Sequence, residues 1–150
     1  MKTDIFNRNF KNGFTIIELL VVVAIATLIL SFVFVSVREA KARSRDARRE
    51  QDIKQLQNSL GIYHINRRQF PVCSLGAINS SSDCLSLAIF ADNVANVLSL
   101  DPLGGGTGEC LAAGVFVYCY ESNGNDYTLH YNLETNSIPG KSTGWQKIGP

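Results

Sequence analysis

The chain has 150 residues, a formal net charge of +1 and an apolar content of 45%. This length allows one modest domain together with an extended element. A net charge so close to zero gives no strong field toward nucleic acid, so we expect no nucleic-acid partner.

Residues 1–13 form a short polar segment that precedes a long apolar run. The basic residues in this segment are Lys2, Arg8 and Lys11. A secretory signal would place its apolar stretch before the cleavage site. Here the polar segment ends at Gly13 and the apolar run follows it. We therefore predict a leader peptide over 1–13 and retention of the apolar run in the mature protein.

Residues 14–37 are predicted to cross a membrane as a helix. Their sequence, FTIIELLVVVAIATLILSFVFVSV, holds one ionisable side chain, that of Glu18. About 24 residues at about 1.5 Å per residue span about 36 Å, enough for a tilted helix to cross a bilayer. Insertion scales give a cost on the order of 2.5–3.5 kcal/mol for Asp at the bilayer centre. A carboxylate in this position is therefore a candidate functional residue.

Residues 38–70 are predicted to continue the helix outside the membrane. The segment has no proline and one glycine, Gly61, and it is rich in Ala, Arg, Gln and Leu, which are good helix formers. Apolar residues recur on one face of this helix, at Ile53, Leu56, Leu60 and Tyr63. We expect the last three turns to pack under a globular head and the helix to end by Phe70-Pro71. The charged residues over 38–52 either pair between subunits or form a solvated face, and both alternatives stay open.

Residues 71–150 are predicted to form the globular head. Residues 72–84 are rich in Ser and Asn, which favours a loop, and 85–100 are apolar enough for a short helix or turn layer. In the C-terminal part, the β-branched and aromatic runs 115–121 and 126–132 flank Asn123-Gly124.

Asn-Gly between two such runs is a strong signal for an antiparallel hairpin. The sequence also allows a third strand near 144–148. The expected fold class is therefore α+β: a long N-terminal helix, transmembrane in its N-terminal half, packed on a small antiparallel β-sheet.

The cysteines all lie in the predicted head, at Cys73, Cys84, Cys110 and Cys119. No C-x-x-C pair occurs, which argues against a zinc ribbon or a thioredoxin-like motif. Four cysteines in a small domain beyond a membrane segment fit disulfides in an oxidising compartment, and free buried thiols are the alternative. Of the three pairings that four cysteines allow, we favour Cys73–Cys84 with Cys110–Cys119, because each pair closes a short loop.

The stretch Gly13-Phe14-Thr15-Ile16-Ile17-Glu18-Leu19-Leu20 closely resembles the type IV prepilin processing signature. The resemblance combines a short basic leader, a glycine followed by phenylalanine, a glutamate and an uninterrupted apolar helix. It implies that an inner-membrane prepilin peptidase cuts after Gly13 and methylates the new N-terminus at Phe14. It also implies a single-pass inner-membrane protein with an extracytoplasmic head, which an inner-membrane assembly platform then polymerises into a helical filament through this helix.

Further along, residues 46–71 and 100–103 look like the core of major pseudopilins and related small pilins. The calcium loop of that family has no convincing counterpart here, because Asn123, Asn125 and Asp126 offer one carboxylate in a hairpin turn. We expect no metal and no cofactor.

Cleavage would create a partner for Glu18. The new α-amino group of Phe14 lies four residues away, about 6 Å along the helix axis. In a staggered array, Glu18 of one subunit could neutralise the Phe14 amine of its neighbour, which would offset much of the cost of burying either charge. The alternative is a glutamate that reaches the lipid headgroups and has no partner.

The distribution of basic residues conflicts with an extracytoplasmic head. Three basic residues precede the apolar run and six follow it, between Arg38 and Arg49. The positive-inside rule therefore favours a cytoplasmic head. We place the head outside because of the processing signature and the cysteines.

The sequence does not support an enzyme. Gly140-Lys141-Ser142-Thr143-Gly144 matches G-x-S-x-G, but that motif needs an acid and a histidine downstream, and neither follows. We therefore expect a structural subunit of a type IV pilus or of a type II secretion pseudopilus, and the sequence does not separate these two. The alternative function is a monomeric, membrane-tethered, extracytoplasmic binding module.

Overall fold

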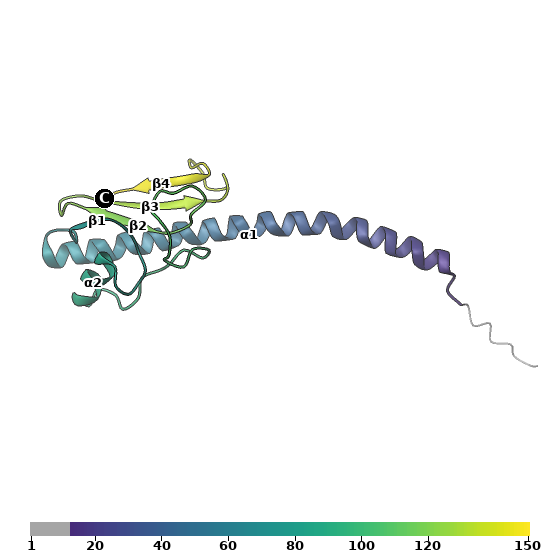
Figure 1. The fold of residues 1–150 in the computed structure, drawn as a ribbon, viewed down its shortest axis with the longest axis horizontal. Coiled ribbons are helices and arrows are strands. Elements are labelled where there is room, and N and C mark those ends of the chain that lie inside the picture. Colours follow the sequence, from purple (N-terminus) through teal and green to yellow (C-terminus); the bar gives the residue numbers. More distant parts are fainter. Residues whose placement is uncertain (1–12) are drawn as a thin grey trace, which may run out of the picture. The chain divides into compact units, whose positions relative to one another are not determined.

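The computed structural model describes residues 13–150 and has an α+β fold, which confirms the predicted fold class (Figure 1). Two helices and four strands follow one another in the order α1 (Ile16–Arg67), β1 (Cys73–Ala77), α2 (Cys84–Ala91), β2 (Cys119–Ser122), β3 (Tyr127–Leu133) and β4 (Gly144–Ile148). The chain divides into two compact units, one up to Glu39 and the other from Ala40 to Pro150. The predicted leader, 1–13, lies outside the described residues except for Gly13.

The first unit contains the apolar part of α1. Within residues 13–150, α1 is the one helix that is long and apolar enough to cross a membrane. Large apolar side chains along this part are exposed, for example Ile16 at 85%, Leu28 at 63% and Val37 at 42%. The hydroxyl groups of Thr27 and Ser31 donate to the carbonyl oxygens of Ala24 and Leu28, at 2.9 and 2.7 Å. Both groups therefore have a partner inside the helix, which a lipid environment requires.

The second unit is built on an antiparallel sheet with the strand order β1-β2-β3-β4. The β2–β3 hairpin turns at Asn123-Gly124, as predicted. The Asn123 side chain accepts hydrogen bonds from the backbone of Asn125 and Asp126, at 2.9 and 3.0 Å. Gly124 adopts a positive φ of 97°, which glycine tolerates best. The strand that the sequence allows near 144–148 is present as β4.

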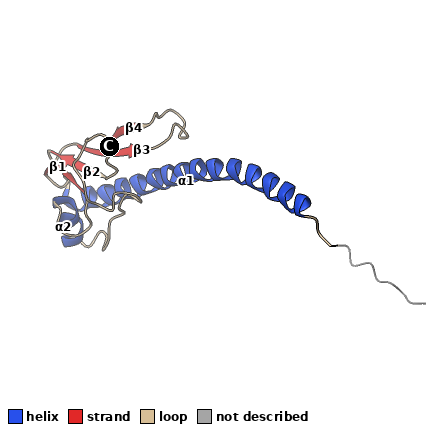
Figure 2. Ribbon diagram, turned by 45° about the vertical axis from the view of Figure 1, so that its right-hand side comes forward, coloured by secondary structure: helices blue, strands red, loops and turns tan. Residues whose placement is uncertain are grey.

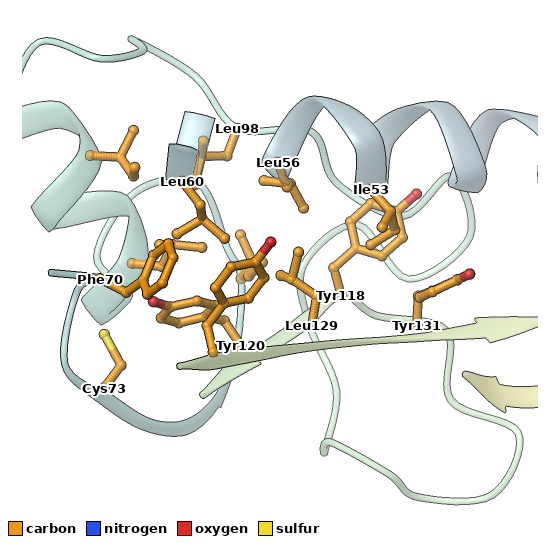
Figure 3. Close-up of a cluster of buried hydrophobic side chains, with 14 of the residues drawn as sticks. Ile53, Leu56, Leu60, Phe70, Cys73, Leu98, Tyr118, Tyr120, Leu129 and Tyr131 are labelled. Atoms are coloured by element: carbon orange, nitrogen blue, oxygen red, sulfur yellow. The ribbon is translucent and has the colours of Figure 1, made fainter. Parts of the chain in front are cut away.

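The core of this unit lies between the sheet and the C-terminal half of α1 (Figure 3). The predicted face of α1 is buried at Ile53, Leu56 and Leu60, which are at most 2% exposed. The sheet presents aromatic and leucine side chains to this face, namely Tyr120, Tyr127, Leu129, Tyr131 and Leu133, and Tyr118 adds to them from just before β2. Helix α2 lies beside the last turns of α1 and contributes Leu85 and Ile89 (Figure 2).

The prediction of a loop over 72–84 is wrong for its first part, because Cys73–Ala77 forms the edge strand β1. The segment has none of the β-branched residues that mark a strand. It pairs with β2 across a register shift between Cys73 and Gly76, and the amide of Ile78 donates to the carbonyl oxygen of Tyr118 at 2.8 Å. Long-range pairing thus overrides the local composition. The rest of the segment is a turn that leads to Asp83, the N-cap of α2.

The prediction that the last three turns of α1 pack under the head is too short. Packing begins about three turns earlier, because Asp46 and Arg49 are completely buried. At the other end, α1 stops at Arg67, before Phe70-Pro71.

Candidate functional site

The first turn of α1 is closed by a reciprocal pair of hydrogen bonds between Thr15 and Glu18. The Thr15 hydroxyl oxygen accepts from the Glu18 amide at 3.3 Å. In return, Glu18 Oε2 accepts from the Thr15 hydroxyl at 3.3 Å and from the Thr15 amide at 3.5 Å. This is a capping box, in which the side chain of each residue accepts a hydrogen bond from the backbone amide of the other. It explains why the helix begins at Ile16.

This arrangement gives Glu18 a local role that the sequence analysis missed. The spacing Thr-x-x-Glu is visible in the sequence, but the sequence analysis assigned the glutamate only a partner in a neighbouring subunit or a position at the lipid headgroups. The positive end of the helix dipole also favours a carboxylate at this position. Within residues 13–150, only Oε2 accepts these bonds, so Oε1 keeps its acceptor capacity.

Gly13 and Phe14 lie just before the capped turn, and both are exposed. A Cβ atom placed on Gly13 would meet nothing within 4 Å. Both residues of the predicted cleavage site are therefore uncovered in the single chain. This placement brings the three processing and assembly candidates, Gly13, Phe14 and Glu18, into one short segment at the start of α1.

A second polar group lies in the other unit and centres on Arg49. Its guanidinium forms a two-bond pair with Asp101, with Nε donating to Oδ2 at 2.7 Å and Nη2 to Oδ1 at 3.1 Å. Nη1 donates to Asp46 and to Glu134, both at 2.7 Å. The side chains of Arg49, Asp46 and Asp101 are fully buried. Burial lowers the pKa of Arg49, but these hydrogen bonds outweigh it and raise that pKa above its ordinary value.

The same group fixes two loops to α1. Asp46 accepts hydrogen bonds from the amides of Glu134 and Thr135, at 3.0 and 2.8 Å. Asp101 Oδ1 accepts from the amide of Leu103 at 2.8 Å. Arg45 donates to both oxygens of Glu134, and this hydrogen bond lowers the pKa of the Glu134 carboxyl. We call these five side chains the Arg49 cluster: Arg45, Asp46, Arg49, Asp101 and Glu134.

The Arg49 cluster corrects the expectation for the charged residues over 38–52. For Arg45, Asp46 and Arg49, the partners belong to the same chain, so neither pairing between subunits nor a solvated face describes them. Asp52 is buried as well and accepts from the Tyr118 hydroxyl at 2.9 Å. The partners lie far away in the sequence, 52 residues from Arg49 in the case of Asp101, so no local pattern could reveal them.

The cysteines form two disulfides, Cys73–Cys84 and Cys110–Cys119. These are the pairs that the short loop lengths favour. The first ties β1 to the start of α2, and the second ties the loop before β2 to that strand. Within residues 13–150, no group of His, Cys, Asp and Glu side chains is arranged to hold a metal ion.

The segment that matches G-x-S-x-G has a structural role through its lysine. Lys141 Nζ donates to Glu50 Oε1 at 2.7 Å and also contacts the Tyr131 hydroxyl. Burial raises the pKa of Tyr131 to about 12, so its hydroxyl stays protonated and donates to Glu50 at 2.6 Å. Ser142, the residue in the nucleophile position of the motif, is exposed.

Residues 8–34 match a family model described as the prokaryotic N-terminal methylation motif. This motif is the signature of type IV prepilins and pseudopilins. It covers the start of α1 with Gly13, Phe14 and Glu18. No curated protein and no solved structure matches the chain.

Proposed function

We propose that this type IV pilin- or pseudopilin-like precursor is a structural subunit of a type IV pilus or a type II secretion pseudopilus. The observation that carries the proposal is the methylation motif over residues 8–34. In this proposal, prepilin peptidase cuts between Gly13 and Phe14 and methylates the Phe14 amine. The mature chain then polymerises into a helical filament through residues 14–37. Proteins with this signature are structural and are not enzymes.

The exposed apolar surface of α1 supports polymerisation. Its side chains are uncovered in the single chain, and a surface of this size needs lipid or protein around it. Before assembly, lipid would cover it. In a filament, the same side chains would pack against those of other subunits, where close contacts and the exclusion of lipid stabilise the array.

Glu18 would set the position of each subunit relative to its neighbour. The capping box holds one carboxylate oxygen toward Thr15 and leaves Oε1 as an acceptor. The Phe14 amine of an adjoining subunit would donate to this oxygen. A charge pair with good hydrogen bonds offsets much of the desolvation cost, whereas either charge alone in an apolar core is expensive.

The proposed organisation follows from these roles. Residues 1–13 are the leader, 14–37 span the inner membrane, 38–70 carry the helix out of it, and 71–150 form the head. The two disulfides support an extracytoplasmic head, because disulfides persist in oxidising compartments. The proposed partners are prepilin peptidase, an inner-membrane assembly platform, membrane lipid and further copies of this chain.

Mass spectrometry tests the processing step. We would extract the protein from membranes of cells that contain prepilin peptidase and of cells that lack it. The expected product with the peptidase begins at Phe14 and carries one added methyl group. An unprocessed N-terminus in the presence of an active peptidase would reject the proposal.

Substitution of Glu18 tests assembly and separates the subunit from a tethered binding module. Glu18→Ala is expected to reduce filament yield strongly without preventing cleavage. The matched control is Glu109→Ala, which removes an exposed acid in the head. A tethered monomer would behave in the same way with either substitution.

A further inference from the structure

The folded head changes the charge that α1 exposes just after its apolar run. Three acids on this part of the helix turn toward the head: Asp46 and Asp52 are at most 7% exposed, and Glu50 is bonded to Lys141 and Tyr131. The fourth, Glu39, is exposed. Arg45 and Arg49 are paired inside the Arg49 cluster. Over residues 38–52 the helix therefore turns three of its four acids toward the head, while several of its basic side chains stay at the surface.

The exposed basic residues on this part of α1 are Arg38, Lys41, Arg43 and Arg48, and two of them, Lys41 and Arg48, are spaced to act together. Lys41 is exposed and has no ion pair among residues 13–150. The Arg48 side chain is 65% exposed, and its nearest acid, Asp52, is 3.7 Å away, too far for a hydrogen bond. Seven residues separate the two, which is two helical turns, so both lie on the same side of α1.

We propose that Lys41, assisted by Arg48, binds the phosphate groups of anionic phospholipids at the membrane surface. The inference rests on the proposed function in one respect, namely that residues 14–37 occupy a bilayer. It does not depend on cleavage or on filament assembly. The partner is the headgroup layer of a lipid surface, and neither a free phosphate ion nor nucleic acid.

The height of each residue above the apolar run supports this assignment. Lys41 lies four residues beyond Val37, about 6 Å along the axis, and the headgroup layer on each side of a bilayer is about 5–7 Å thick. Lys41 therefore reaches the phosphates directly. Arg48 lies about 16 Å beyond Val37, and its side chain ends within about one Debye length of the layer, where attraction is weaker. Helix tilt shortens both heights but keeps their order.

Lys54 provides a matched control. It is an exposed basic residue on α1 like Lys41, but it lies about 25 Å beyond Val37. At this height, the attraction of an anionic surface is screened at physiological salt. The inference thus predicts a graded effect, largest for Lys41, smaller for Arg48 and absent for Lys54.

The experiment uses the full chain in lipid nanodiscs made of phosphatidylcholine with a minor fraction of phosphatidylglycerol. The phosphatidylglycerol that stays bound to the protein is measured by native mass spectrometry. Lys41→Gln is expected to reduce its enrichment about fivefold, the factor that one basic residue contributes at an anionic surface. Arg48→Gln should reduce it less, Lys54→Gln should leave it unchanged, and Lys41→Arg should preserve it.

Each outcome decides the inference. Equal effects of Lys41→Gln and Lys54→Gln, or displacement of the lipid by free glycerol phosphate, would overturn it. A chain that enters the nanodisc without any enrichment of phosphatidylglycerol overturns it while leaving the proposed function intact. A chain that does not enter the bilayer overturns both.

Discussion

Arg49 and Asp101 lie 52 positions apart in the sequence and form a buried, two-bond ion pair inside the head. Because neither side chain reaches solvent, water cannot replace a lost partner. The intact pair fixes the loop at Asp101 to α1. If one partner is removed, the other is left as a buried charge without compensation.

The first prediction concerns the removal of this acid. Asp101→Ala is expected to lower the free energy of unfolding of the head by about 3–5 kcal/mol, because it strands Arg49. Urea denaturation followed by Trp145 fluorescence measures the change. The control is Asp126→Ala, which removes an exposed acid and should change stability by less than about 0.5 kcal/mol. Similar losses for both variants would contradict the role of the buried pair.

The second prediction concerns the acid side of the pH profile. The pKa of Glu134 is lowered in the folded head by its hydrogen bond with Arg45. Because this pKa is lower in the folded head than in the unfolded chain, the ionised carboxylate stabilises the head at pH values above the unfolded pKa of 4.5. This stabilisation is lost as the pH falls through the folded pKa. We expect the free energy of unfolding to decrease below about pH 4.5.

Glu134→Gln should make this acid decrease shallower, because glutamine does not titrate. Glu109→Gln is the comparison, since Glu109 is exposed. If the two variants give the same pH profile as the unmodified chain, the Arg45–Glu134 pair does not control acid stability.

The third prediction concerns the start of α1. Thr15→Ala removes the hydroxyl that accepts from the Glu18 amide and should destabilise the first turn by about 0.5–2 kcal/mol. Hydrogen exchange of the amides at residues 17–19, measured in detergent micelles, should become faster. Thr15→Ser keeps the hydroxyl and should keep the protection, so equal exchange in both variants would argue against the capping box.

The fourth prediction concerns the disulfides. Each closes a loop of about ten residues, for which the chain-entropy estimate is about 2–3 kcal/mol of stability. Cys110→Ser with Cys119→Ser should lower the urea midpoint of the head, and reduction of the unmodified chain should lower it further because it opens both bonds. Peptide mapping under non-reducing conditions checks the pairing. A Cys73–Cys110 or Cys84–Cys119 peptide would contradict it.

Local signals account for the parts of the fold that the sequence predicts. The hairpin is one example, because Asn123 and Gly124 determine the turn themselves. The buried stripe of Ile53, Leu56 and Leu60 is another, since its period belongs to a single helix. Strand β1 was missed because its pairing with β2, and not its own composition, makes Cys73–Ala77 extended.

The charged part of α1 shows more clearly what the sequence alone could not predict. Asp46 and Arg49 look like residues of a polar helix, and only the folded head supplies Asp101 and Glu134. For the candidate site, the processing motif was readable because it is a continuous stretch of sequence. The capping box between Thr15 and Glu18 was equally local, and it was missed because Glu18 was considered only for its charge and not as part of a helix start.

The Arg49 cluster also has a mechanical consequence for any force that acts along α1 within the second unit. One arginine bonds to three carboxylates, so the helix cannot slide by one turn along the sheet without breaking several charged bonds together. The sheet and the loops at Asp101 and Glu134 are thus tied to this part of α1 at one fixed register.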